Sequence, residues 1–251
     1  MRLCVIIPTY NNATTVRQVI EEVEHYQSDI IVVNDGSTDN TTDILRDLAP
    51  SVIVITYEKN RGKGHALVTG FREAIKRAFT HAITIDADGQ HLASDIPRLI
   101  AATKDNPQGI IVGSRNLTEE NMPRQNTFAN KFSNFWFRLQ TTIPLPDTQS
   151  GYRLYTLSAL RGLSLITSRY EAELELLVFA AWAGKAITST PVSVYYPPDE
   201  LRVSHFRPVY DFARISLLNT LLCLLAIVYG YPSILLRKAL RTLNKQREKN
   251  K

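Results

Sequence analysis

The stretch AITIDADGQH, residues 82–91, decides how the rest of the chain is interpreted, because it joins a short apolar run to a group of acids. The run AITID is apolar and partly β-branched, as in a buried strand. Extended residues alternate sides, so Asp86 and Asp88 point to one side of the chain and Ala87 to the other. Two interpretations are open: a solvated turn, or a carboxylate pair that binds a divalent cation together with substrate phosphates. A calcium-binding EF-hand is excluded, because His91 stands where that loop requires glycine.

Short β-branched runs alternate with helical patterns through the first part of the chain. The predicted strands are CVIIP, DIIVVN, SVIVIT, AITID and GIIVG, and the predicted helices between them are ATTVRQVIEEVEHYQ, NTTDILRDLA, GHALVTGFREAIKRAF and SDIPRLIAATK. Because near-continuous apolar strands that alternate with helices form a mostly parallel sheet covered on both faces, we predict an α/β, Rossmann-like fold. Ligands of such sheets bind beyond the carboxyl ends of the strands. The polar segments PTYNN, NDGSTDN and DADGQH all lie at such ends.

The second half of the chain continues the same domain before its composition changes. RQNTFANKFSNFWFRLQTT and RYEAELELLVFAAWAG predict helices, and GYRLY and AITSTPVSVYY predict strands. We therefore predict one α/β domain over residues 1–205, followed by an apolar helical segment and a basic tail over 206–251. The segment 215–236 contains no charged residue, would span ~33 Å as a straight helix, and is expected to be interrupted at Gly230 and Pro232. It either spans a membrane, lies in the membrane plane, or is a buried helix of a soluble or oligomeric protein.

The net charge of +5 is concentrated in the tail. Residues 237–251 carry seven basic side chains and one acid, which leaves the other residues at −1. The tail contains no aromatic residue for base stacking, so we expect no nucleic-acid partner; an anionic membrane surface is favoured, with a solvated disordered tail as the alternative.

Cys4 and Cys223 form no disulfide pattern, and the short apolar run at the N-terminus is no signal peptide. We therefore expect the protein at the cytoplasmic face of a membrane, with a homo-oligomer through the apolar helix as a further possibility.

The usual phosphate-binding loops are missing from this sequence. No G-x-G-x-x-G motif follows the first strand, and NRGKGHA lacks the Ser or Thr of a P-loop. A bound diphosphate would therefore need another source of positive charge. A metal ion held by Asp88, with Asp86 close by, would supply it.

Six segments together resemble a known family: VIIPTYNN, VVNDGSTDNT, NRGKGHA, DADGQH, GSR and DTQSGYRLY. They occur in the order found in family 2 glycosyltransferases of the GT-A fold, and are most similar to the branch with dolichyl-phosphate mannose synthases and bacterial polyprenyl-phosphate glycosyltransferases. The resemblance covers roughly residues 3–205. It implies an inverting, metal-dependent transfer of a sugar from a nucleoside-diphosphate sugar to a membrane-associated acceptor, either a polyprenyl phosphate or a glycolipid.

The resemblance also implies roles for individual residues. Donor contacts are implied for Pro8, Tyr10, Asn11, Asp35, Lys63, Asp86 and Arg115. The metal, Mg²⁺ or Mn²⁺, would be held by Asp88 with help from Gln90, and Asp147 would be the catalytic base or an orienting group. Contacts with acceptor or donor phosphates are implied for Arg124, Arg153, Arg202 and Ser204.

Simpler explanations exist for several of these residues taken singly. Asp35 and Asp147 are common turn residues, and Lys63 and Arg115 are ordinary surface charges. Two other functions are also open: a nucleotidyltransferase, and a non-catalytic membrane adaptor that retains a sugar-nucleotide fold. The product distinguishes them, because a glycosyltransferase releases nucleoside diphosphate, a nucleotidyltransferase releases pyrophosphate, and an adaptor releases neither.

Overall fold

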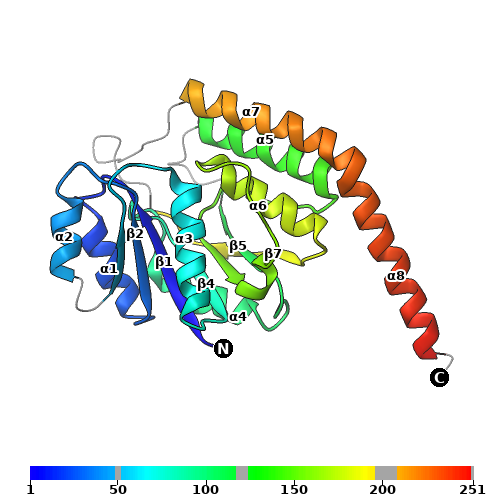
Figure 1. Ribbon diagram of the computed structural model, residues 1–251, viewed down its shortest axis with the longest axis horizontal. Helices are drawn as coiled ribbons and strands as arrows, with labels where there is room; N and C mark the ends of the chain where they lie inside the picture. The colour runs from blue at the N-terminus through cyan, green and yellow to red at the C-terminus, as the bar shows by residue number, and fades with distance from the viewer. Residues whose placement is uncertain (49–51, 117–123, 196–207, 250–251) are drawn as a thin grey trace.

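The structure, a computed structural model, describes residues 1–48, 52–116, 124–195 and 208–249 (Figure 1). Its strands are β1 (Leu3–Thr9), β2 (Ile30–Asn34), β3 (Ile53–Thr56), β4 (His81–Thr84), β5 (Ile110–Arg115), β6 (Arg153–Thr156) and β7 (Ile187–Val192). Its α-helices are α1 (Val16–Glu24), α2 (Thr41–Leu48), α3 (Lys63–Lys76), α4 (Ile96–Ala102), α5 (Arg124–Thr141), α6 (Glu171–Trp182), α7 (Pro208–Leu225) and α8 (Tyr231–Lys249). The strands and helices expected from the sequence are all present.

The strands form one seven-stranded sheet in the order β3-β2-β1-β4-β6-β5-β7. β6 is antiparallel to both of its neighbours, β4 and β5, and the other neighbouring pairs are parallel. The prediction of a mostly parallel α/β sheet is therefore confirmed. The reversed strand has a consequence for the site, because the chain enters β6 from the edge at which the parallel strands end.

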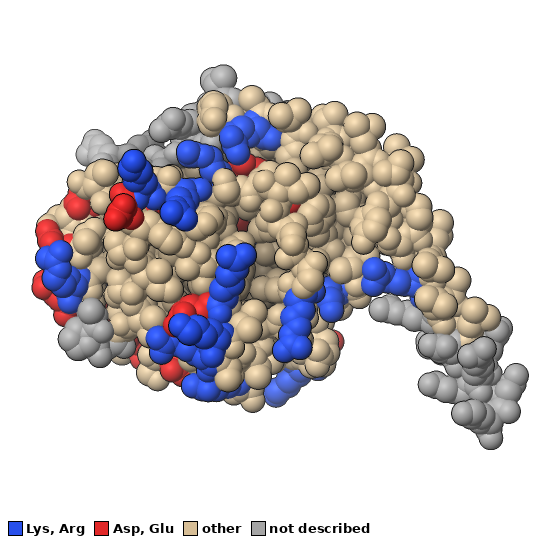
Figure 2. All heavy atoms as spheres, viewed as in Figure 1, with Lys and Arg blue, Asp and Glu red and all other residues tan. Residues whose placement is uncertain are grey.

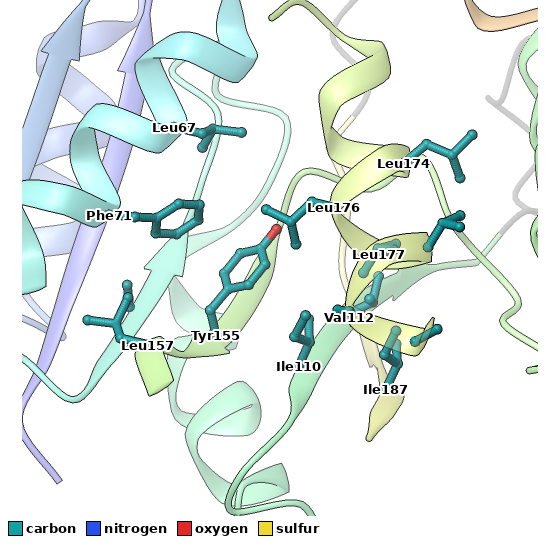
Figure 3. Packing of buried hydrophobic residues seen from close by; sticks show 14 of the residues in the cluster. Leu67, Phe71, Ile110, Val112, Tyr155, Leu157, Leu174, Leu176, Leu177 and Ile187 are labelled. Carbon is teal, nitrogen blue, oxygen red and sulfur yellow. The ribbon is translucent and has the colours of Figure 1, made fainter. Parts of the chain in front are cut away.

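Helices cover both faces of the sheet, because the strands are apolar on both sides (Figure 1). In β1, Cys4 and Ile6 belong to one buried cluster, and Val5 and Ile7 belong to the other. The first cluster includes residues of α3, α6 and α7, and the second includes residues of α1, α2 and α4. Figure 3 shows the first cluster, in which the ring of Phe71 from α3 lies 4.9 Å from that of Tyr155 in β6.

The sheet topology brings the predicted motifs to one edge. β1, β2, β3, β4 and β5 run parallel, so the segments that follow them leave the sheet at the same edge. The segment before β6 reaches this edge from the opposite direction, since β6 is antiparallel. Residues from the whole domain therefore meet where ligands of such sheets bind.

The apolar segment near the C-terminus forms one long helical path. α7 continues into α8 through a π-helical turn, Ala226–Gly230. The interruption expected at Gly230 and Pro232 takes this form, because a wider turn accommodates a proline that cannot donate a backbone hydrogen bond. Residues 213–240 are long and apolar enough to cross a membrane by length and composition. The boundary predicted at residue 205 lies outside the described residues and stays a prediction.

Candidate active site

The loops after β1, β2 and β4 are joined by hydrogen bonds. The side chain of Asn11 accepts the Thr38 N–H at 2.7 Å, and the Asn11 N–H donates to the Ser37 hydroxyl at 2.9 Å. Asn11 has a left-handed φ of +52°, which asparagine tolerates better than most residues. The Thr15 hydroxyl donates to the Ala87 carbonyl at 2.6 Å and so ties the first loop to the acidic one. The expected meeting of the three polar segments is confirmed.

Asp35, at the end of β2, fixes the loop that leads into α3. It is only 2% exposed, and its two oxygens accept the N–H groups of Arg61 at 2.8 Å and Gly62 at 2.7 Å. Burial raises the pKa of Asp35, and the two N–H groups act against that change. Its contact with the sugar-nucleotide donor stays a prediction. Of the other predicted donor residues on β1, Pro8 is buried within the strand, whereas Tyr10 beyond its end is partly exposed.

Lys63, in the first turn of α3, lies between two carboxylates. Its Nζ is 2.7 Å from Asp86 Oδ1 and 2.8 Å from Glu173 Oε2. Burial opposes the charged form of each group, but their attraction outweighs it, which raises the pKa of Lys63 and lowers the pKa of Asp86. Gly151 packs against this pair, because a Cβ there would lie 2.7 Å from Asp86 Oδ2 and 2.9 Å from Lys63 Nζ. The protein itself therefore supplies the cation of Asp86.

Asp88 differs from Asp86 in its surroundings. Within the described part of the chain, no basic side chain lies at ion-pair distance from its carboxylate, which accepts the Gln90 N–H at 3.0 Å. Burial, followed by repulsion from Asp86, raises the pKa of Asp88 to about 6. Ala87 between them is buried, as expected if it points to the other side. Asp88 is thus a carboxylate for which no ion pair is found among the described residues, whereas Asp86 shares Lys63 with Glu173.

The residues at Asp88 fit a hard cation whose coordination is completed by substrate. Over residues 1–48, 52–116, 124–195 and 208–249, no three His, Cys, Asp or Glu side chains are grouped to hold a metal ion. Mg²⁺ is often bound by one or two carboxylates together with substrate phosphates, and this needs no such group. Asp88 offers a carboxylate, and Gln90, partly exposed in the same loop, offers an amide oxygen. A divalent ion at these two residues would need the oxygens of a bound donor.

Arg115, at the end of β5, forms a bidentate ion pair with Asp147. Its Nε is 2.7 Å from Asp147 Oδ2 and its Nη2 is 3.0 Å from Oδ1. Asn130 of α5 also donates to Oδ1, at 2.6 Å, as do the N–H groups of Gln149 and Ser150, both at 3.1 Å. Burial would raise the pKa of Asp147, but the hydrogen bonds and charge of Arg115 outweigh it and lower that pKa. Asp147 has no exposed surface. This geometry fits the orienting role and speaks against the catalytic base.

The expectation that Arg153 meets a phosphate is corrected by its contacts. Arg153 is fully buried at the start of β6. Its guanidinium donates to the backbone carbonyls of Ser150 at 2.7 Å, Thr148 at 2.9 Å and Glu173 at 2.8 Å. It therefore fixes the turn before β6 from inside the protein, where a buried cation is tolerated because its donors are satisfied.

Three other predicted residues are not tested by the structure. Arg202 and Ser204 lie outside the described residues. Arg124 begins α5, but its side chain is not among those described. Their contacts with phosphates stay predictions.

Two residues of the site were missed by sequence analysis. Glu173 had a signal, because α6 is otherwise apolar and carries three acids, Glu171, Glu173 and Glu175, all buried. Buried carboxylates require partners, so such a pattern predicts specific ion pairs or hydrogen bonds. Asn130 had no comparable signal, since an asparagine on an amphipathic helix looks like any polar surface residue.

Comparison with known proteins shows the family of the chain. Residues 4–163 match the sequence model of Glycosyl transferase family 2. The chain is 34% identical over 212 residues to the UDP-N-acetylglucosamine–dolichyl-phosphate N-acetylglucosaminyltransferase of Methanococcus voltae, covering 76% of this chain and 84% of that protein. It is 30% identical over 204 residues to the undecaprenyl-phosphate mannosyltransferase of Micrococcus luteus, covering 77% of this chain and 83% of that protein.

The fold is also found among solved structures. The glucosyl-3-phosphoglycerate synthase of Mycobacterium tuberculosis, solved in complex with Mn²⁺, UDP-glucose and phosphoglyceric acid, superposes with a TM-score of 0.63 at 18% identity. The match covers 90% of this chain and 79% of that one. At this identity the likeness concerns the fold alone, which is GT-A. From the family match, the relatives and the fold together, the chain is a glycosyltransferase and belongs to glycosyl transferase family 2.

Proposed function

We propose that the protein transfers a sugar from a nucleoside-diphosphate sugar to a polyprenyl phosphate, with inversion at the anomeric carbon and with help from Mg²⁺ or Mn²⁺. The names of the relatives from Methanococcus voltae and Micrococcus luteus support this acceptor class. The observation that carries the proposal is the pairing of charges at the site. Asp86 and Asp147 each have a cation from the protein, whereas Asp88 has none among the described residues.

On the donor side, Asp88 and Gln90 would hold the metal, and the loop of Tyr10 and Asn11 would line the nucleotide pocket. The ion would neutralise the negative charge that develops on the departing diphosphate. Lys63, held between Asp86 and Glu173, would partly offset the negative charge of the acids near the metal. In an enclosed site such preorganised charges stabilise a leaving group more than they would in water.

On the acceptor side, Arg115, which the sequence predicted as a donor contact, would instead bind the lipid phosphate, since a guanidinium suits phosphate oxygens and Asp147 fixes its orientation. A phosphate oxygen then forms a bond to the anomeric carbon while the bond from that carbon to the diphosphate oxygen breaks. No proton has to be removed, because the attacking oxygen is already ionised at neutral pH. This agrees with the burial of Asp147, which leaves it unsuited to act as a base.

A lipid acceptor implies that the enzyme works at a membrane, and we place it at the cytoplasmic face. The apolar helix at residues 213–240 and the basic residues of 237–251 support a membrane surface as partner.

The test is a donor screen with purified protein and a short polyprenyl phosphate, read out as nucleoside diphosphate release and as sugar in the lipid phase. We expect transfer with one UDP- or GDP-sugar, loss of transfer with chelator, and recovery with added Mn²⁺ or Mg²⁺. Polyprenol, which carries a hydroxyl in place of the phosphate, is the matched control and should not react. Pyrophosphate as product, full activity in chelator, or equal transfer to the alcohol would contradict the proposal.

A further inference from the structure

The C-terminal helices carry a large exposed apolar surface. We define the apolar helical face as the exposed apolar side chains of α5, α7, the π-helical turn and the first part of α8: Phe135, Leu139, Leu217, Leu221, Leu224, Ile227, Val228, Leu235 and Leu236. α5 and α7 lie side by side, and the surface over the later part of α7 and the start of α8 is uncharged in Figure 2. Soluble monomers rarely expose so many apolar side chains together, so this face requires a partner.

The opposite side of the same helix belongs to the protein core. Leu218, Leu222 and Ala226 are buried, at a spacing of four that follows one side of a helix. Asn219 is also buried there, and the Gln140 amide of α5 donates to its Oδ1 at 3.1 Å. A helix that crosses a bilayer alone is surrounded by lipid on all sides. This helix can offer lipid only one side, because the other is occupied by α5 and α6.

Polar contacts tie the helix to α6 at both ends of its apolar part. Arg214 in α7 forms an ion pair with Glu171, the first residue of α6. Arg237 in α8 donates through Nη1 to the Ala183 carbonyl, directly after α6, at 2.6 Å. Between these contacts Gly230 lies so close to the tryptophan that ends α6 that a Cβ would be 2.5 Å from its Nε1. The apolar part therefore cannot leave the domain without breaking all three contacts.

The chain beyond the last of these contacts is unsuited to span a bilayer. A spanning helix needs about 20 consecutive apolar residues. The apolar segment 215–236 lies between Arg214 and Arg237, which are both fixed to the domain. From there on, residues 237–251 carry seven basic side chains and one acid.

We propose that the apolar helical face lies in the plane of the interface of an anionic bilayer, with α7 and the start of α8 parallel to the membrane and with the positive charge of the sequence over residues 237–251 favouring anionic headgroups. This rests on the proposed function, since a lipid-linked acceptor brings the enzyme to a bilayer. Helices with one apolar side and adjacent basic residues bind in this way, with the apolar side ~5–10 Å deep. Anionic lipids attract the neighbouring Lys and Arg side chains.

α5 connects this face to the acceptor side of the site. Its Asn130 and Ser133 contact Asp147 and Thr148, at 2.6 and 2.7 Å, while its Phe135 is 61% exposed in the apolar helical face. α5 thus contacts Asp147, which orients Arg115, and also contributes Phe135 to the apolar helical face. A polyprenyl phosphate whose phosphate group contacts Arg115 would keep its prenyl chain in the bilayer.

Flotation of the full-length protein with vesicles tests this arrangement. We expect binding to vesicles of phosphatidylcholine with phosphatidylglycerol, weaker binding to phosphatidylcholine alone, and a decrease at high salt. The double variant Leu217→Gln/Val228→Gln should lower the partition coefficient at least ~10-fold, because both side chains enter the interface. The matched control is Ile75→Gln/Ile166→Gln, two exposed apolar residues elsewhere on the domain (44% and 66% exposed), and it should bind like the unmodified protein.

A C-terminal epitope tag then reports the topology. With protein added to preformed vesicles, the tag should be removed by external protease without detergent. A tag that is protected until detergent is added would show a spanning helix and overturn the proposal, and so would equal binding of the two double variants. A dimer that does not float and that becomes monomeric in Leu217→Gln/Val228→Gln would show that a second copy covers the face. None of these readouts measures transfer, so a failure to transfer sugar would count against the proposed function alone.

Discussion

Replacement of Asp88 by asparagine should stabilise the metal-free protein while it abolishes transfer. In the folded chain the Asp88 carboxylate is partly buried beside Asp86, which raises its pKa from 3.8 to about 6. In the unfolded chain the same group titrates near its ordinary value, so at neutral pH folding confines a charge that the unfolded state solvates freely. Asparagine removes this charge and keeps the oxygen that accepts the Gln90 N–H.

The magnitude follows from the two pKa values. The difference between 3.8 and about 6 corresponds to about 3 kcal/mol at neutral pH. Solvent screens a carboxylate that is only partly buried, so we expect a gain of about 1–3 kcal/mol in the free energy of unfolding. The size of this stability gain depends on pH. Well below pH 3.8 the group is protonated in both states and the variant gains nothing; the gain develops as pH rises from about 4 to 6 and is complete above it.

The assay is urea unfolding of both proteins in chelator at pH 4, 5, 6 and 7.5. A stability difference that is small at pH 4 and several times larger at pH 7.5 is the expected result. Addition of Mn²⁺ with a nucleoside diphosphate should then raise the midpoint of the unmodified protein and leave the variant unchanged. A variant that is less stable than the unmodified protein at pH 7.5, or a difference independent of pH, would refute the reasoning.

Two further substitutions test the packing of the site. Gly151→Ala places a methyl group 2.7 Å from Asp86 Oδ2, so we expect a lower melting temperature and a rise of at least ~10-fold in KM for the donor; unchanged donor kinetics would show that the carboxylate can move without cost. Asp147→Asn leaves the Arg115 charge uncompensated and turns an amide donor toward it, so we expect urea unfolding to show a loss of about 3–5 kcal/mol. The exposed acid Asp105 is the control, and Asp105→Asn should change stability by less than ~0.5 kcal/mol. An Asp147 variant that matches this control would contradict the buried pair.

Much of the fold could be predicted from local patterns. The apolar β-branched runs and the helices between them are present in the structure, because alternating burial on two faces of a sheet leaves a direct mark on the sequence. Asp86, Asp88 and Arg115 lie at one edge of the sheet, because each of them lies at or just beyond the end of a strand and these strands run in the same direction.

The partners of buried charges could not be predicted in the same way. Nothing near Lys63 in the sequence indicates that Glu173, more than a hundred residues later, shares its ammonium group. Asp147 and Arg153 likewise looked like accessible site residues, whereas tertiary packing buries both of them. Long-range contacts of this kind depend on where helices settle on the sheet, and periodicity does not encode that.

The direction of β6 has an evolutionary consequence. This strand enters the sheet from the ligand edge, and the turn that carries Asp147 follows β1 to β5 in the sequence. Under the proposed function, most donor contacts would then come from residues up to β5, and the residues that fix the acceptor phosphate would come largely from the stretch after it. Changes in the later stretch would then be expected to alter the acceptor more than the donor, except at Gly151 and Glu173, which pack on Asp86 and Lys63.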